Sequence, residues 1–181
     1  MVLKMTVETE LASLSIPLQF LAFSDAYLDS ASHLCTILSR SYRKSNYARG
    51  SVVLYLTFHA IELFLKGAIL ERSPNEPVGK THDLQTLNKR YRKVYPDKKF
   101  VLDAPFISRD ETDIASLLGP EYLININVTE QKNPWDQRHR YPRNRDTQPW
   151  AGLVGFEPVS FLLEIKKLKA DITRLEGLIF S

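Results

Sequence analysis

The sequence predicts an all-α protein, an antiparallel up-and-down helical bundle that carries one irregular inserted segment. The stretch at 50–72 is apolar almost all the way round, and those at 17–40 and from Phe161 to Ile179 repeat apolar residues at intervals of three and four. That interval is typical of helices that pack along one face. The chain also has only seven glycines in 181 residues, which disfavours a dinucleotide-binding fold.

Residues 17–181 are expected to form a single domain, preceded by a lead-in of residues 1–16. Pro17 stands where proline is common, at the start of a helix. A polar, basic turn at 41–50 separates the first long helix from the second. The insertion is placed at about 96–157, with a short helix at 110–118, a strand or hairpin arm at 121–130 and an irregular stretch at 131–155.

The second helix is apolar almost all the way round, yet it carries a polar stripe on one face. The stripe consists of Tyr55, His59, Glu62 and Lys66, at spacings of four, three and four. Burial of such groups is costly unless they are paired or hydrogen-bonded, so the stripe must meet partners, solvent or a ligand. The presence of His59, Glu62 and Lys66 in the middle of this apolar run also argues against a membrane span.

Two interpretations of the stripe are open. In the structural one, Glu62 pairs with Lys66, or the stripe pairs with His82 and Asp83 of the next helix and fixes the register of the bundle. In the functional one, the stripe lines a pocket in which His59 or Glu62 carries a proton. His59, Glu62 and a distant His82 do not have a recognised zinc spacing, so no metal is expected.

Thr81 is predicted to cap a short third helix that runs through Leu84 and Tyr91 and ends before Pro96, with Asp83 in its first turn. Either Thr81 or Asp83 could satisfy the free backbone N–H groups. The same helix start could attract an anion such as phosphate.

The last helix steps by four and three through an apolar heptad seam: Phe161, Ile165, Leu168, Ile172, Leu175 and Ile179. Such a seam indicates either one more helix of the bundle or a dimerisation helix. The other positions of this helix carry charged residues.

Composition narrows the classes of function. Hydrophobic residues make up 44% and charged residues 25%, with a net charge of +3, as in an ordinary globular protein. The single cysteine, Cys35, excludes an intrachain disulfide and is expected in the core. The N-terminus lacks the order of a signal peptide, so a cytoplasmic location is expected. No phosphate-binding glycine loop, Cys-x-x-Cys or Gly-x-Ser-x-Gly motif is present, and no cofactor is expected.

Residues 131–150 form an arginine-rich stretch with five Lys/Arg against two Asp. Guanidinium groups can clamp phosphates while aromatic rings stack on bases, which favours contact with a nucleic acid or phosphate. The alternative is a loop whose arginines pair with acids elsewhere. The residues concerned are Arg138, Arg140, Arg143 and Arg145, interleaved with Trp135, His139, Tyr141 and Trp150.

Three short motifs resemble those of the HEPN domain family, the helical domain of prokaryotic nucleotidyltransferase-partner and toxin proteins. They are AIELFLK at 60–66, THDL at 81–84 and RYP at 140–142. The resemblance implies an up-and-down bundle, commonly a homodimer, with a groove between helices or protomers. It also implies a possible nucleotidyltransferase or antitoxin partner.

The ribonuclease members of that family carry an arginine four to six residues before a histidine. None of the four histidines here has an arginine at that spacing. The expected function is therefore binding of a nucleotide, RNA or partner protein by the polar stripe, the 81–83 helix start and the arginine-rich stretch. The alternatives are an unconventional metal-independent ribonuclease and a purely structural dimerising adaptor.

Overall fold

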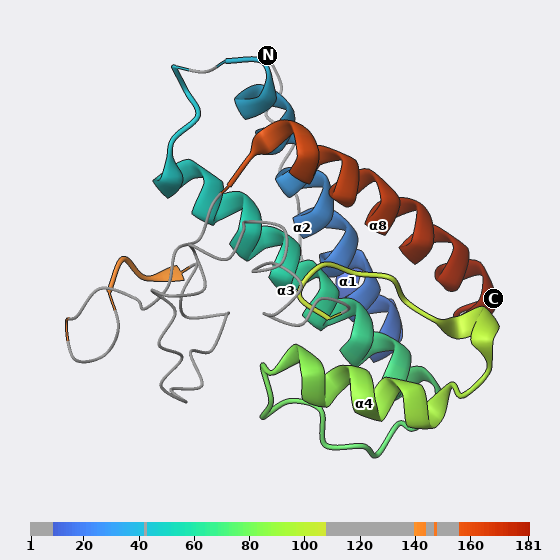
Figure 1. Ribbon diagram of the computed structural model, residues 1–181. Helices are drawn as coiled ribbons and strands as arrows, with labels where there is room; N and C mark the ends of the chain where they lie inside the picture. Colours follow the sequence, from blue (N-terminus) through green and yellow to red (C-terminus); the bar gives the residue numbers. More distant parts are fainter. Residues whose placement is uncertain (1–8, 42, 108–139, 144–146, 148–155) are drawn as a thin grey trace, which may run out of the picture.

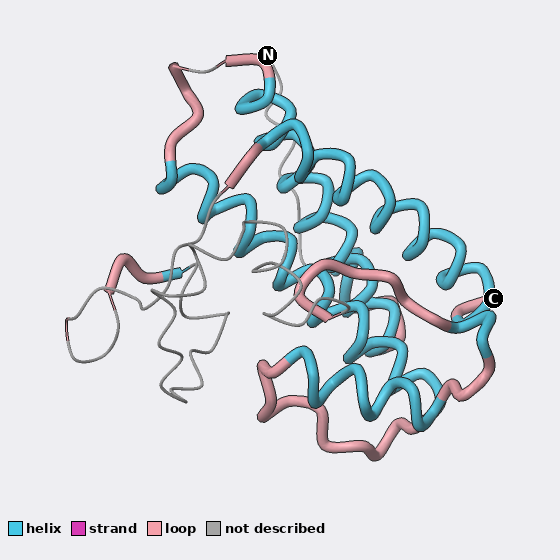
Figure 2. Tube along the Cα trace, in the orientation of Figure 1, coloured by secondary structure: helices cyan, strands magenta, loops and turns pink. Residues whose placement is uncertain are grey.

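The computed structural model describes residues 9–41, 43–107, 140–143, 147 and 156–181, and it confirms the all-α bundle (Figure 1). The long helices are α2 (Ile16–Ser39), α3 (Tyr47–Arg72) and α8 (Pro158–Ile179). The shorter elements are α1 (Thr9–Ala12), α4 (Leu84–Val94) and the 3-10 turn η1 (Lys98–Phe100). The described ranges contain helices and loops but no strand (Figure 2).

Capping side chains decide where two of these helices begin. α3 starts at Tyr47, three residues before the prediction, because Asn46 accepts a hydrogen bond from the backbone N–H of Arg49 at 3.0 Å. Asp83, and not Thr81, is the N-cap of α4, and its carboxylate accepts from the Thr86 N–H at 2.9 Å. Thr81 lies too early in the chain to reach that turn.

α2 runs antiparallel to both of its neighbours. On the α3 side, Ser24 donates to the carbonyl of Ala60 at 2.8 Å, whereas the start of α2 lies against Gly67. On the α8 side, the Cys35 thiol lies 3.3 Å from the carbonyl of Pro158, and Asp29 pairs with Lys169. α3 and α8 therefore run parallel to each other (Figure 1).

The heptad seam of α8 packs inside the chain. Its four central residues are buried, and α2 is the main partner of this helix. The interpretation of α8 as one more bundle helix is confirmed, and its seam is occupied by the chain itself. The four residues are Ile165, Leu168, Ile172 and Leu175.

α3 is the central helix of the core. Of the described helices it alone is long and apolar enough to cross a membrane, but 72% of its apolar window is buried within the bundle. Its apolar faces are covered by α2, α4 and α8. A helix that is apolar all round is accounted for here by protein packing on several sides.

The first part of the inserted segment belongs to the core. Phe100, Leu102 and Ala104 are buried, and the Tyr91 hydroxyl donates to the Phe100 carbonyl at 2.7 Å. Phe106 has a left-handed φ of 70° and packs against Phe58 of α3. The short helix expected at 110–118, the strand or hairpin arm expected at 121–130 and most of the stretch at 131–155 lie outside the described residues.

Candidate functional site

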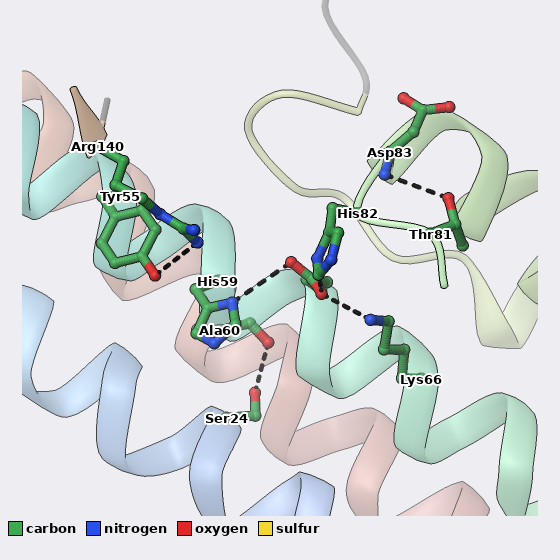
Figure 3. Close-up of polar contacts among 10 residues, drawn as sticks. Ser24, Tyr55, His59, Ala60, Lys66, Thr81, His82, Asp83 and Arg140 are labelled. Carbon is green, nitrogen blue, oxygen red and sulfur yellow. Dashed lines mark hydrogen bonds and ion pairs between the residues drawn. The ribbon is translucent and has the colours of Figure 1, made fainter. Parts of the chain in front are cut away.

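The polar stripe of α3 is organised around the carboxylate of Glu62, which is only 2% exposed. Lys66 Nζ donates to Glu62 Oε1 at 2.7 Å, one helical turn further on. His82 Nδ1 lies 3.0 Å from the same oxygen, and His59 Nδ1 lies 3.3 Å from Oε2 (Figure 3). These four residues are called the Glu62 cluster below.

The electrostatics of the cluster fix its protonation. Burial alone raises the pKa of Glu62, but hydrogen bonds and charge from His59 and Lys66 outweigh burial and lower this pKa to about 2. Glu62 is therefore ionised at neutral pH and can only accept hydrogen bonds. It follows that Nδ1 of His59 and of His82 donates to this carboxylate, and that Nε2 is the ring nitrogen that Glu62 leaves unengaged. The interpretation of Glu62 as the proton carrier is thereby disfavoured.

The two histidines reach Glu62 from different elements. His59 lies one turn before Glu62 on α3, whereas His82 comes from the loop that precedes α4 and is 55% exposed. Asp83, the next residue, uses its carboxylate to cap α4 and does not join the cluster. The structural interpretation named two residues near the start of α4, His82 and Asp83, as partners of the stripe, and of these two only His82 contacts Glu62.

Aromatic rings continue the site towards the start of α3. The ring of Tyr55 lies parallel to that of His59, with 5.8 Å between centroids, and Tyr27 of α2 meets His59 edge-on at 4.7 Å. Arg140 donates to the Tyr55 hydroxyl at 3.0 Å, and its guanidinium lies 4.9 Å from the Tyr55 ring centroid (Figure 3). Tyr55 thus links Arg140 to the Glu62 cluster.

The arginine-rich stretch is only partly described. Arg138 and His139 lie outside the described residues. Arg140 contacts Tyr55, Arg143 donates to the carbonyl of Thr147 at 2.8 Å, and Tyr141 is 53% exposed. Among the described residues of this stretch, 140–143 and 147, Arg140 is the one with a contact to the polar stripe.

The cluster resembles a metal site in composition but not in geometry. Both histidines approach Glu62 through hydrogen bonds, and Lys66 occupies the same carboxylate. Within the described ranges, no group of three or more His, Cys, Asp or Glu side chains is arranged to hold a metal ion.

Sequence reasoning missed Tyr27, which packs on His59 from α2. No spacing in the sequence relates Tyr27 to His59, because the two residues lie on different helices. Sequence reasoning also missed the exposed basic residues of α4, Lys89 and Lys93.

No protein-family model, curated protein or solved structure matches this chain. The HEPN resemblance therefore depends on the three motifs of the sequence itself.

Proposed function

We propose that this chain is a HEPN-like binding module for a phosphate-containing ligand, a nucleotide or RNA, held beside the polar stripe of α3. The observation that supports the proposal is the meeting of the three motifs. Glu62 of the first motif accepts from His82 of the second, and Arg140 of the third contacts Tyr55 on the same helix. Segments some 20 and 78 residues away from Glu62 in sequence thus supply side chains along one side of α3.

The chemistry offered to solvent suits an anion. Arg140 and His82 are exposed, whereas the negative charge of Glu62 is buried and paired with Lys66. A guanidinium presents several donors in a plane, the arrangement that matches phosphate oxygens. The hydrogen bond from Arg140 to the Tyr55 hydroxyl holds this guanidinium beside Tyr55, whose ring lies parallel to that of His59.

Binding of fluorescent ATP and of a short single-stranded RNA, followed by anisotropy, tests the proposal. Arg140→Gln and His82→Gln should each weaken binding about 10- to 150-fold, because each removes one charge-assisted contact worth about 1.5–3 kcal/mol. The matched controls are Arg143→Gln in the same segment and His33→Gln on the exposed side of α2. Neither control residue contacts the stripe, so both variants should bind as the wild type does.

The proposal fails if the wild type binds neither ligand, or if all four variants bind alike. Circular dichroism of each variant shows that the bundle is retained. Loss of binding in the two controls as well would indicate a general charge effect.

The fixed tautomers also favour a second function, metal-independent cleavage of RNA. Attack by a 2′-hydroxyl requires a general base and a general acid, and His59 and His82 each hold Nε2 ready while Glu62 orients the ring. Cleavage in EDTA should be lost in His59→Ala and His82→Ala, and a 2′-deoxy residue at the cleaved position should abolish it. Intact RNA after incubation with the wild type would exclude this function.

From the HEPN resemblance we further propose that this chain forms a homodimer and that it binds a nucleotidyltransferase or antitoxin partner. Because α2 covers the heptad seam of α8, a dimer of this chain would have to use another face. Light scattering after size exclusion measures the mass directly. If ligand binding and cleavage both fail and a dimer is found, the dimerising adaptor is the function that remains.

A further inference from the structure

The strongest concentration of charge in the chain surrounds α4. Residues 72–99 contain eight Lys/Arg and three Asp/Glu, an excess of +5 that exceeds the net charge of the whole chain. Residues 100–130 hold one basic and six acidic residues, so the positive charge is segregated in sequence. α4 itself has four basic residues in eleven and no acidic one.

Helical geometry gathers these charges on the outside of the bundle. α4 turns Leu84, Leu87 and Tyr91 to the core. Lys89 and Lys93 are exposed on its opposite side, one turn apart. Arg72, at the end of α3, and Arg90 line a groove of about 610 Å³ together with Lys93 and Glu76. The α4 basic surface is defined here as Arg72, Lys89, Arg90 and Lys93.

The charges of this surface are poorly neutralised. Arg90 lies 3.9 Å from Glu76, with both side chains more than a third exposed, and it also donates to the Pro77 carbonyl at 3.1 Å. Exposed ion pairs of this kind contribute little to the free energy of folding. Among the described residues, neither Lys89 nor Lys93 has an acidic partner within ion-pair distance.

We propose that the α4 basic surface binds the phosphate backbone of a nucleic-acid duplex, independently of base sequence. One helical turn of about 5.4 Å separates Lys89 from Lys93, so the two ammonium groups can contact neighbouring phosphates of one strand. The aromatic residues of this region, Tyr91 and Tyr95, are buried, so no ring is available for stacking on unpaired bases.

The same surface fits other partners less well. No large apolar side chain is exposed between residues 72 and 99, whereas a membrane or a stable protein interface needs such anchors. The inference goes beyond the proposed function, because none of its residues belongs to the Glu62 cluster or contacts Tyr55.

The test is the salt dependence of binding to a labelled 20-base-pair duplex, as DNA and as RNA. Lys89→Gln/Lys93→Gln should make the negative slope of log K against log salt shallower by about 1.8 for DNA, since each phosphate contact contributes about −0.9. The matched control, Lys166→Gln/Lys167→Gln, removes the same charge from exposed positions of α8 and should leave the slope unchanged.

Several outcomes would overturn the inference. These are absence of duplex binding by the wild type at low salt, an equal change of slope in the α8 control, and tighter binding to polyglutamate than to the duplex. The last result would assign the surface to an acidic protein. The Lys89→Gln/Lys93→Gln variant should keep wild-type affinity for ATP, so failure here is distinguishable from failure of the site beside the Glu62 cluster.

Discussion

Replacement of Glu62 by glutamine removes one charge from the centre of the site with little change of shape. Lys66, only 4% exposed, then loses its ionic partner. Removal of one member of a buried ion pair costs about 3–5 kcal/mol. The pKa of Glu62 leads to a similar figure, because a decrease from 4.5 to about 2 corresponds to about 3 kcal/mol at neutral pH. We therefore expect Glu62→Gln to lower the free energy of unfolding by about 3 kcal/mol.

The same substitution predicts a pH dependence whose sign is fixed. The pKa of Glu62 is lower in the folded chain, so its contribution to stability is complete above the ordinary pKa of 4.5 and is lost as the pH falls towards 2. The difference in unfolding free energy between wild type and Glu62→Gln should thus decrease from about pH 5 to about pH 2.

Urea unfolding followed by far-UV circular dichroism measures both effects. Glu76→Gln is the matched control, because Glu76 lies 3.9 Å from Arg90 in an exposed pair and should contribute less than about 1 kcal/mol. Equal losses in the two variants would refute the role of Glu62 as a buried organising charge. A difference between wild type and Glu62→Gln that is constant with pH would refute the lowered pKa.

Three further predictions concern packing, capping and reactivity. Gly67→Ala should lower the melting temperature, because a Cβ there would lie 3.0 Å from the Pro17 carbonyl, whereas Gly177→Ala, with open space around it, should stabilise α8 by up to about 1 kcal/mol. Asp83→Ala should cost about 1 kcal/mol in thermal unfolding through loss of the α4 N-cap. Burial raises the pKa of the Cys35 thiol to about 11, so mass spectrometry should detect alkylation by iodoacetamide only after unfolding in urea.

Local periodicity was sufficient to predict the long helices. Apolar spacing places the first helix at 17–40 and a nearly continuous apolar run places the second at 50–72, and the structure has α2 and α3 at Ile16–Ser39 and Tyr47–Arg72. The difference at Tyr47 arises from the Asn46 side chain, because capping depends on side-chain geometry that periodicity does not contain. The same limit explains why the cap of α4 was assigned to Thr81.

The sequence predicts only those contacts of the candidate site that join residues within one turn of a helix. The Glu62–Lys66 pair follows from one turn of helix, and it is present. The contact between Arg140 and Tyr55 joins residues 85 positions apart, and no spacing rule specifies it. The excess of basic residues at 72–99 is also present in the sequence, but the arginines interleaved with aromatic residues favour 131–150 as the stretch that contacts phosphate.

Phe161, at the start of α8, contacts Phe106 on one side and Phe156 on the other. Phe106 and Phe156 are therefore two stems that lie close together in space, although 50 positions separate them in the sequence. A short linker could join these two stems with a small loop-closure cost, since that cost grows only slowly with length. The 48 intervening residues, 108–155, include Arg140, so such a linker would remove the contact with Tyr55 while Phe106 and Phe156 keep their packing against α8.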